Sequence, residues 1–360
     1  MKKILIVLPS LGIGGVESIV RQLIDGFDNE FYFEILLFKK DEIFFEREDI
    51  KINQFYISST FSLFLFFVKF ILLSRNFNII HAHTFYAIVF SRLMKIFNWK
   101  LKIISSEHSS LNKNTIRTKY RILYRYTDFL SNINTNVSKF SANSYFRYNY
   151  TKKEATVIYN GIKDISSTTV LLNDISLGEI FNRYDKVILF VGRICEEKDC
   201  FNLLEAYRIL VEKTDLNVAL FFVGDGPLFN ELKRKVHIYD LEENVLLFGV
   251  RHDVNDFYKL CDLFVLSSIT EGLPTVILEA IFKNKIIVST ECGGVKEIFS
   301  NNYPFLVPIC SPEMLSEAML KALFINENLQ MKIISDYDEI KLKFSANYFI
   351  EKWKSIYKGL

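Results

Sequence analysis

Two glutamates, Glu271 and Glu279, flank the start of a predicted helix, and their type and spacing suggest chemistry. The apolar residues 262–266 predict a buried strand, and Pro274 is well placed as the first residue of the helix. A helix that opens there directs unpaired backbone N–H groups and the positive end of its dipole toward an anionic ligand. Because carboxylates accept hydrogen bonds from vicinal hydroxyls, the stretch suits a ligand that carries both phosphate and sugar.

The same stretch also has a purely structural interpretation. In that interpretation Glu271 caps the helix and Glu279 is a solvent-facing helix carboxylate. Gly272 and Leu273 complete the turn, and Gly272 allows a ligand to approach the backbone closely. On this stretch alone both interpretations stay open.

Two cations form a second group of candidates. The segment V-G-R-I-C-E-E-K follows a predicted strand at residues 187–191, so that Arg193 and Lys198 lie just beyond the strand end. Two permanent cations at a strand–helix junction can clamp a diphosphate and neutralise the charge that builds on it as it leaves. The alternative is a salt bridge from either cation to the neighbouring Glu196 or Glu197.

A glycine loop near the N-terminus places Gly14 and Gly15 between a strand at residues 4–8 and a helix at residues 16–25. A dinucleotide fingerprint would require glycine where the chain has Glu17, so nicotinamide binding is not expected. The loop can still bring backbone N–H groups close to a phosphate or a sugar. A tight turn into a helix explains both glycines equally well.

Histidines end two of the predicted strands. One strand ends at Glu107 and His108, and another ends at His81 and His83. Ligands gather beyond the carboxyl ends of strands in an open parallel sheet, so His108 is the candidate site residue. Its alternative role is a polar residue that caps the strand, and for His81 and His83 the structural role is favoured.

The order of strands and helices predicts two doubly wound α/β domains. In the first series we expect strands at residues 4–8, 31–38, 77–83, 101–108 and 156–162 and a crossover helix at 61–75. In the second series we expect strands at residues 187–191, 217–223, 244–248, 262–266, 285–289 and 304–307. The predicted domains are residues 1–165 and 184–345, joined by a polar, Ser/Thr-rich linker at 166–183.

Length and composition agree with two domains. The chain has 360 residues, of which 50% are hydrophobic, and a formal net charge of +2, which gives no global case for a nucleic acid partner. The 5 cysteines form no C-x-x-C pair, so we expect free thiols in a reducing cytosol and no metal site.

Two apolar segments of the chain are too short for membrane targeting. The N-terminal apolar run ends at Pro9 after six residues, which predicts a first strand and no signal peptide. Residues 61–73 contain Lys69 and are shorter than the roughly 18–20 residues that a transmembrane helix requires. We interpret them as a buried helix.

The segment at residues 111–153 is basic and aromatic. Its nine Lys or Arg residues face one acid, Asp128, and six tyrosines are interleaved with them. The basic residues are 113, 117, 119, 121, 125, 139, 147, 152 and 153, and the tyrosines are 120, 124, 126, 145, 148 and 150. This composition suits the headgroup region of an anionic membrane, with a solvated face as the alternative and nucleic acid as the least favoured partner.

Taken in order, these segments resemble the retaining glycosyltransferases of family four. The shared parts are G-G-V-E, S-S-E-H-S, V-I-Y-N-G-I, V-G-R with a lysine five residues later, V-G-D-G-P, F-G-V-R-H-D-V, and the Glu-x7-Glu of E-G-L-P-T-V-I-L-E-A. No single motif is specific, but the ordered set is. The resemblance implies the GT-B architecture, in which two Rossmann-like domains face each other across a deep cleft and a C-terminal helix, here about residues 346–360, crosses back onto the first domain.

The resemblance also implies roles for the candidate residues. Glu279 resembles the residue that holds the donor ribose hydroxyls, Glu271 contacts the transferred sugar, and Arg193 and Lys198 clamp the diphosphate. The remaining matches are Gly272, Leu273 and Pro274, where the backbone approaches sugar and phosphate, Arg251, near the base, Gly14 and Gly15, in the N-terminal loop, and His108, which reaches the sugar. The two acids Glu196 and Glu197 depart from a purely cationic clamp and partly offset its charge.

The expected activity is transfer of a hexosyl unit from a UDP- or GDP-sugar, UDP being favoured, to a lipid-linked or polysaccharide acceptor in cell-surface polysaccharide synthesis. The sugar nucleotide is a co-substrate, and neither a cofactor nor a metal is expected. We expect a cytoplasmic protein on the inner face of the membrane. The alternatives are a sugar-nucleotide epimerase of the same fold and a noncatalytic partner of a glycosyltransferase.

Overall fold

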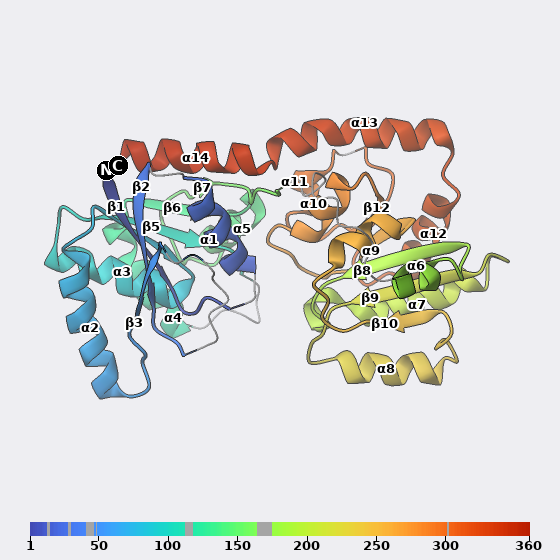
Figure 1. The fold of residues 1–360 in the computed structure, drawn as a ribbon, viewed down its shortest axis with the longest axis horizontal. Coiled ribbons are helices and arrows are strands. Elements are labelled where there is room, and N and C mark those ends of the chain that lie inside the picture. The colour runs from blue at the N-terminus through green and yellow to red at the C-terminus, as the bar shows by residue number, and fades with distance from the viewer. Residues whose placement is uncertain are drawn as a thin grey trace. The chain divides into compact units, whose positions relative to one another are not determined.

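The computed structural model describes residues 1–12, 15–27, 30–40, 47, 49–111, 118–163, 175–300 and 302–360. The chain divides into two compact units, which are described separately below and drawn in Figure 1. Unit 1 comprises Met1–Gly161 and Ala346–Leu360, and unit 2 comprises Ile162–Ser345.

The described residues of unit 1 form a seven-stranded sheet in the order β3-β2-β1-β4-β5-β6-β7, with parallel pairing throughout. The strands are β1 (Lys2–Leu8), β2 (Phe31–Leu37), β3 (Lys51–Gln54), β4 (Ile79–His83), β5 (Lys102–Glu107), β6 (Ile133–Asn136) and β7 (Thr156–Val157). The helices are α1 (Gly15–Asp25), α2 (Thr60–Ser74), α3 (Phe85–Phe97), α4 (Thr118–Thr127), α5 (Lys139–Arg147) and α14 (Ala346–Gly359), with a short 3-10 helix, η1, at Asp128–Leu130.

The described residues of unit 2 form a six-stranded parallel sheet in the order β10-β9-β8-β11-β12-β13. The strands are β8 (Lys186–Val191), β9 (Val218–Val223), β10 (Val245–Leu247), β11 (Leu263–Leu266), β12 (Ile286–Thr290) and β13 (Leu306–Val307). The helices are α6 (Ile175–Phe181), α7 (Cys200–Val211), α8 (Phe229–Ile238), α9 (Val254–Leu260), α10 (Thr275–Phe282), α11 (Val295–Ile298), α12 (Pro312–Leu323) and α13 (Glu327–Lys343), and the 3-10 helix η2 spans Glu196–Lys198.

The C-terminal helix α14 completes the core of unit 1. Phe349, Trp353 and Tyr357 are buried in one cluster with side chains of β1, β2 and α1. The Tyr357 hydroxyl lies 2.7 Å from Nδ1 of the buried His81, and Figure 1 shows the two ends of the chain side by side. Unit 1 is therefore built from segments at opposite ends of the sequence.

The polar linker predicted at residues 166–183 is wrong in its second half. Residues 175–181 form α6, and the rings of Phe181 and Phe221 lie 4.8 Å apart in an edge-to-face contact within unit 2. The linker residues 166–174 lie outside the described chain. A few apolar side chains in a polar, weakly periodic stretch are enough to pack a helix on a sheet, as Phe181 of α6 packs on Phe221 of β9.

The prediction that residues 61–73 form a buried helix is wrong for one face of α2. Phe66 and Phe70 are buried, but Phe61, Phe64 and Leu72 are 69%, 62% and 55% exposed. A helix that is apolar on all sides can bury only the face that meets its neighbours, so the opposite face of α2 presents large apolar side chains at the surface. Among the described residues, no helix is both long and apolar enough to cross a bilayer.

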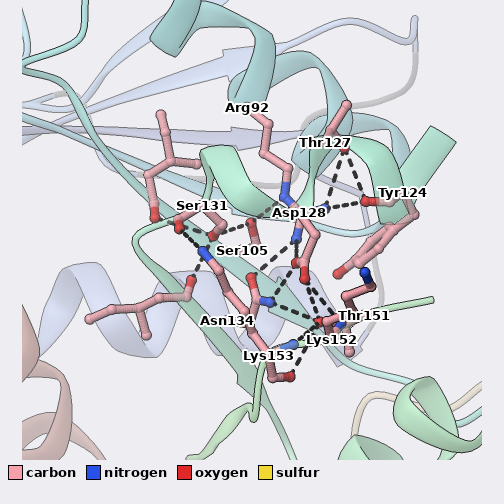
Figure 2. A network of polar contacts seen from close by, with 12 residues as sticks. Arg92, Ser105, Tyr124, Thr127, Asp128, Ser131, Asn134, Thr151, Lys152 and Lys153 are labelled. Atoms are coloured by element: carbon pink, nitrogen blue, oxygen red, sulfur yellow. Dashed lines mark hydrogen bonds and ion pairs between the residues drawn. The ribbon is translucent and has the colours of Figure 1, made fainter. Parts of the chain in front are cut away.

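A buried polar network joins α3, η1 and β6 in unit 1 (Figure 2). The fully buried Arg92 guanidinium donates to Asp128 Oδ1, to Asn134 Oδ1 and to the Tyr124 carbonyl, at 3.0–3.1 Å. Asp128 in turn accepts hydrogen bonds from Asn134 Nδ2 at 2.7 Å and from Thr151 Oγ1 at 2.7 Å. The one acid of the basic segment is thus a structural residue.

Several tyrosines of the basic segment are core residues as well. Tyr124, Tyr145 and Tyr150 are buried, whereas Tyr126 is 74% exposed. These three tyrosines of the six therefore cannot contribute to the expected membrane-facing surface, because they belong to a buried cluster with side chains of β1, β4, β5 and α3. Basic residues 113 and 117 lie outside the described chain.

Candidate functional site

The loops after β8 and β11 meet in unit 2, because these two strands are paired neighbours in the sheet. Lys198 Nζ lies 2.6 Å from Glu271 Oε1, although 73 residues separate them. Ser268 Oγ donates a second hydrogen bond, of 2.8 Å, to the same oxygen. Two of the predicted site residues are therefore in direct contact.

The predicted alternative for the cations, a salt bridge to Glu196 or Glu197, is wrong for the described residues. Lys198 pairs with Glu271, and Arg193 is exposed and forms no salt bridge with a described residue. Backbone and Cys195 hydrogen bonds, and then the charges of Arg193 and Lys198, lower the pKa of Glu197. The Arg193 guanidinium therefore presents its charge to solvent.

Glu279 lies within α10, where Tyr258 from α9 contacts it. The Tyr258 hydroxyl donates a 3.0 Å hydrogen bond to Glu279 Oε2, and burial raises the pKa of Glu279. Its interpretation as a solvent-facing carboxylate is therefore wrong. Pro274 is the N-cap of α10, so the helix begins at Thr275, one residue later than predicted.

Glycines hold the Arg193 loop against its neighbour. Gly192 N donates to the Val223 carbonyl and Ile194 N to the Asp225 carbonyl, both at 3.0 Å. A Cβ on Gly224 would lie 2.0 Å from the Gly192 oxygen, and one on Gly226 would lie 2.3 Å from the Ile194 oxygen. The V-G-D-G-P backbone therefore packs directly on the loop that carries Arg193. Only glycine leaves enough room at positions 224 and 226.

A second pair of glycines supports the Glu271 loop in the same way. Gly293 has a φ of 50°, and a Cβ there would lie 1.8 Å from the backbone carbonyl oxygen of Glu271. A Cβ on Gly294 would lie 2.3 Å from the oxygen of Gly272. Leu273 is also buried. The segment at residues 272–274, where a ligand is expected to approach the backbone, therefore packs against the turn between β12 and α11.

Arg251, expected near a nucleotide base, follows β10 in unit 2. Its guanidinium makes a two-pronged ion pair with Asp253, with Nε–Oδ1 and Nη2–Oδ2 distances of 2.8 and 2.6 Å. This pair lowers the pKa of Asp253. The planar side chain is thereby held in one orientation.

His108 lies in unit 1, where its Nε2 is 2.9 Å from Nδ1 of His83. Burial lowers the pKa of His108 to about 4, so its imidazole is neutral at pH 7. Gly15 is the first residue of α1 and has open space where a Cβ would stand, so sterics do not require glycine there. Gly14 lies outside the described residues.

Sequence reasoning missed Tyr258 and Ser268, which orient the two glutamates. It also missed Ser267, whose hydroxyl donates a 2.8 Å hydrogen bond to the Lys198 carbonyl. This bond connects the loop that carries Arg193 and Lys198 to the end of β11. The pair S-S directly after an apolar strand is a signal for the serines, since strand ends place polar side chains at the ligand edge of the sheet. The described residues contain no cluster of three or more His, Cys, Asp or Glu side chains suited to a metal.

Two protein families match the chain in succession. "Glycosyltransferase Family 4" matches residues 13–164, and "Glycosyl transferases group 1" matches residues 178–336. An uncharacterized glycosyltransferase of Methanocaldococcus jannaschii is 26% identical over 287 residues, which are 71% of this chain and 70% of the relative.

A relative from Campylobacter jejuni covers almost the whole chain. It is named as an α-1,4-N-acetyl-D-galactosaminyltransferase acting on a diphosphoundecaprenol-linked saccharide, and it is 24% identical over 98% of this chain and 97% of its own. The crystal structure of HepE from Anabaena superposes with a TM-score of 0.86 at 18% identity over 100% of both chains. The chain is therefore a glycosyltransferase of the family-four type with the GT-B fold.

Proposed function

We propose that the protein is a retaining glycosyltransferase that moves a hexosyl unit from a UDP-sugar to a lipid-linked saccharide in cell-surface polysaccharide synthesis. The contact of Lys198 with Glu271 carries the proposal, because it joins the expected diphosphate clamp to the expected sugar contact. Glu279 lies on the helix that follows Glu271, where Tyr258 holds its carboxylate, and we assign it to the donor ribose.

The names of similar proteins support the donor and the acceptor. Relatives from Campylobacter jejuni and Escherichia coli are named for transfer to diphosphoundecaprenol-linked sugars, and one from Staphylococcus aureus for capsular polysaccharide biosynthesis. HepE of Anabaena has been solved with UDP and with UDP-glucose. These substrates belong to the named proteins, and we propose substrates of the same classes for this chain.

In the proposed reaction the bond between the sugar anomeric carbon and the diphosphate breaks, and its electron pair stays on the diphosphate. Arg193, Lys198 and the N–H groups at the start of α10 stabilise that charge. Backbone at Gly272, Leu273 and Pro274 approaches sugar and phosphate. The acceptor hydroxyl attacks from the same face, and its proton passes to the leaving phosphate oxygen.

The same charges make a metal unnecessary in this proposal. Lys198 and Arg193 provide two positive charges beside the diphosphate, and the dipole of α10 adds to them. Arg251 is assigned to the base and Glu279 to the ribose, while His108 is assigned to the transferred sugar. None of these assignments requires a cofactor.

Thermal shift against UDP-, GDP- and ADP-sugars tests the donor, since a tight ligand raises the unfolding temperature by mass action. Product formation is then measured by mass spectrometry with the best donor and a diphospholipid-linked sugar. Glu279→Ala and Arg193→Ala should abolish transfer, and the surface variant Lys186→Met should retain it. Wild-type rates in either site variant would refute the assignment, and epimerised donor in the absence of acceptor would favour the epimerase alternative.

We further propose that unit 1 contacts an anionic membrane from the cytoplasmic side through the basic segment 111–153. Among its described residues, the exposed large apolar side chains are Ile122, Leu123, Tyr126, Phe129, Phe140 and Phe146. Lys119 stands among them on α4, so an apolar surface and positive charge occur together, as an interfacial helix requires. The apolar face of α2 is a second candidate contact in the same unit.

Co-sedimentation with phosphatidylglycerol vesicles tests this contact, with phosphatidylcholine vesicles as the charge control. The double variant Tyr126→Ser/Phe129→Ser should lose binding severalfold. The matched control is Phe324→Ser, which removes a side chain that is 59% exposed in unit 2. Equal binding by the double variant and the wild type would exclude this segment.

A further inference from the structure

A cavity of about 180 Å³ lies in unit 1 at the amino-terminal ends of the central strands of its sheet. Lys2, Ile79 and Lys102, which line it, are the first residues of β1, β4 and β5. Leu360, which follows α14, lines another side. His108 follows the carboxyl end of β5, so this cavity lies at the opposite edge of the parallel sheet from the candidate site residue of unit 1.

Positive charge gathers at this cavity. Lys2, Lys100 and Lys102 line it, and among the described lining residues no side chain is acidic. Lys100 and Lys102 form neither an ion pair nor a side-chain hydrogen bond with a described residue. Burial, and then the charges of Lys102 and Lys153, lower the pKa of the nearby Lys95. The charges of Lys100 and Lys102 therefore lack a countercharge among the described side chains.

Two asparagines add neutral donors to the same cavity. The Asn78 side-chain oxygen accepts a hydrogen bond of 2.8 Å from the Lys3 backbone N–H, and the Asn98 side-chain oxygen accepts one of 3.2 Å from the Lys100 backbone N–H. The NH2 group of each amide forms no hydrogen bond with a described residue. Because the backbone engages each oxygen, the NH2 group is the part of the amide that is left to bind a ligand.

Hydrogen bonds hold these donors close together. The Lys102 backbone N–H donates to the Asn78 carbonyl at 3.0 Å, which joins the turn before β4 to the start of β5. Lys2 Nζ donates to the carbonyls of Tyr357 and Lys358 at 3.1 and 2.9 Å, which leaves one ammonium proton for a ligand. Three separate segments of the chain therefore build one set of donors.

The donors select the class of ligand. Ammonium and amide NH2 groups bind acceptors, so an anion is favoured and a cation is not. A phosphate group presents three strong acceptor oxygens and as much as about two negative charges, which engages several of these donors at once. The cavity is smaller than the roughly 300–1,000 Å³ of sites for drug-sized ligands, so it suits a single phosphate group better than a whole nucleotide.

We propose that this cavity binds a phosphate group through the ammonium groups of Lys100 and Lys102 and the amide groups of Asn78 and Asn98. The site goes beyond the proposed transfer reaction and uses none of the residues assigned to it. Its loss would therefore leave the assignment of the donor residues in unit 2 unchanged.

Two sources of phosphate are compatible with this site. One is a soluble phosphate compound. The other is an anionic phospholipid headgroup, because the exposed Ile96, Phe97 and Trp99 stand directly before Lys100 in the chain and supply apolar side chains for a bilayer interface. Lys95 Nζ lies 5.7 Å from the centroid of the Trp99 ring, so positive charge accompanies these apolar side chains.

The first assay titrates inorganic phosphate into the full-length protein at constant ionic strength, followed by phosphorus NMR. Arg193→Ala/Lys198→Ala serves as the background, because it removes two cations of unit 2 that also attract phosphate. In this background Lys100→Gln/Lys102→Gln should raise the Kd for phosphate at least about tenfold, since charge-assisted hydrogen bonds are lost. Circular dichroism confirms that each variant is folded.

Two further variants separate a site from general attraction by charge. Lys39→Gln/Lys40→Gln removes the same charge from exposed positions beyond the carboxyl end of β2 and should leave the Kd unchanged. Asn98→Ser keeps every charge and an acceptor for the Lys100 N–H but loses the NH2 donor, so the Kd should rise about two- to tenfold.

The second assay uses phosphatidylcholine vesicles that contain phosphatidic acid with brominated acyl chains. The chain has 2 tryptophans, and Trp99 is exposed whereas Trp353 is buried, so quenching by bromine reports lipid contact at Trp99. Lys100→Gln/Lys102→Gln should require severalfold more lipid for half-maximal quenching if the phosphate belongs to a lipid. Trp99→Phe identifies the part of the signal that comes from Trp99.

Each outcome decides the inference or the source of the phosphate. Weaker binding of inorganic phosphate with unchanged vesicle binding assigns a soluble phosphate compound, and weaker vesicle binding assigns the phospholipid headgroup. If Lys100→Gln/Lys102→Gln and Lys39→Gln/Lys40→Gln behave alike in both assays, or the protein binds neither probe saturably, the inference is overturned. Wild-type phosphate affinity in Asn98→Ser, beside a loss in the lysine variant, would show attraction by charge alone and would also overturn the site.

Discussion

Two largely buried ion pairs, Arg92–Asp128 in unit 1 and Lys198–Glu271 in unit 2, differ in how completely their charges are satisfied. The first pair is 0% and 6% exposed, and both partners make further hydrogen bonds to neighbouring side chains. The second is 19% and 14% exposed, and Ser268 gives Glu271 its one further side-chain hydrogen bond among the described residues.

The difference separates a structural pair from an exchangeable one. Removing either partner of a closed network leaves a buried charge without compensation, which is strongly unfavourable. Lys198 can instead exchange its carboxylate for a phosphate oxygen of equal charge, and Glu271 can accept sugar hydroxyls in return. A salt bridge in the ligand-free protein can therefore keep a site in shape until the substrate replaces one partner.

The largest expected effect is on stability in unit 1. Asp128→Ala leaves the buried Arg92 guanidinium without its countercharge, so the free energy of unfolding should fall by about 3–5 kcal/mol. Urea unfolding followed by circular dichroism measures this change. Asp25→Ala, which breaks an exposed pair with Arg47, should cost less than about 1 kcal/mol, and equal losses in the two variants would contradict the comparison.

The exchangeable pair should show the opposite pattern. Lys198→Met removes a charge that stabilises the leaving diphosphate, so kcat should fall by about 10²–10³-fold. Stability should change little, because Glu271 is partly exposed and keeps its Ser268 hydrogen bond. Steady-state kinetics and urea unfolding are compared with the control Lys186→Met, which breaks the exposed pair with Asp262; a large stability loss with normal kcat would make Lys198 structural.

The histidines of unit 1 extend the comparison to pH. Burial lowers the pKa of His81, His83 and His108 below the usual value near 6.5, so the unfolded chain binds more protons than the folded one in mild acid. Stability should therefore fall between pH 6.5 and 5, by at most about 1.4 kcal/mol per pH unit for each histidine. Glu107 opposes this trend, because its raised pKa makes the folded state bind the extra proton.

Unfolding temperatures at several pH values measure the slope. His108→Gln should flatten it, and His252→Gln, at an exposed position in unit 2, should not. A slope that is the same in both variants would show that His108 does not contribute to the acid response.

The smallest expected effect concerns the residue that orients Glu279. Tyr258→Phe removes one hydrogen bond to its carboxylate, worth about 0.5–1.5 kcal/mol, so the donor KM should rise about two- to tenfold with a smaller change in kcat. Tyr207→Phe, which removes a buried hydroxyl bonded to the Val218 carbonyl, is the control for lost tyrosine hydrogen bonding in unit 2. Equal donor KM values in Tyr258→Phe and wild type would exclude the positioning role.

Much of the fold could be predicted because most strands are short, continuous apolar runs between turn residues. The predicted strands of unit 2 match β8–β13 to within about two residues at each end. β3 and β6 were missed because K-I-N-Q and I-N-T-N are polar. Among the strands that the structure describes, β3 pairs with β2 alone at one side of the sheet. The polar residues of β6 are buried by partners far away in sequence, such as Arg92 on Asn134.

The candidate site was predicted in part for a similar reason. Glu271 and Glu279 share a strand–turn–helix segment, so their spacing in the sequence is enough to predict them as site residues. Tyr258 lies on α9, and only the fold places its hydroxyl at Glu279. Glu107 stands next to the favoured His108 at a strand end, but no local pattern reveals that one of its oxygens is buried without a hydrogen-bond partner among the described residues.

The position of α14 has a consequence for biosynthesis. Unit 1 is started first on the ribosome, but the Phe349, Trp353 and Tyr357 side chains that close its core are added only after the whole of unit 2. At a synthesis rate of ~5–20 residues per second, unit 1 stays incomplete for about 10–40 s. During this time α14 does not yet cover His81 or the apolar side chains beside α1. Unit 2 is continuous and can fold during that interval, so nascent unit 1 is the part of the chain that depends most on protection by chaperones.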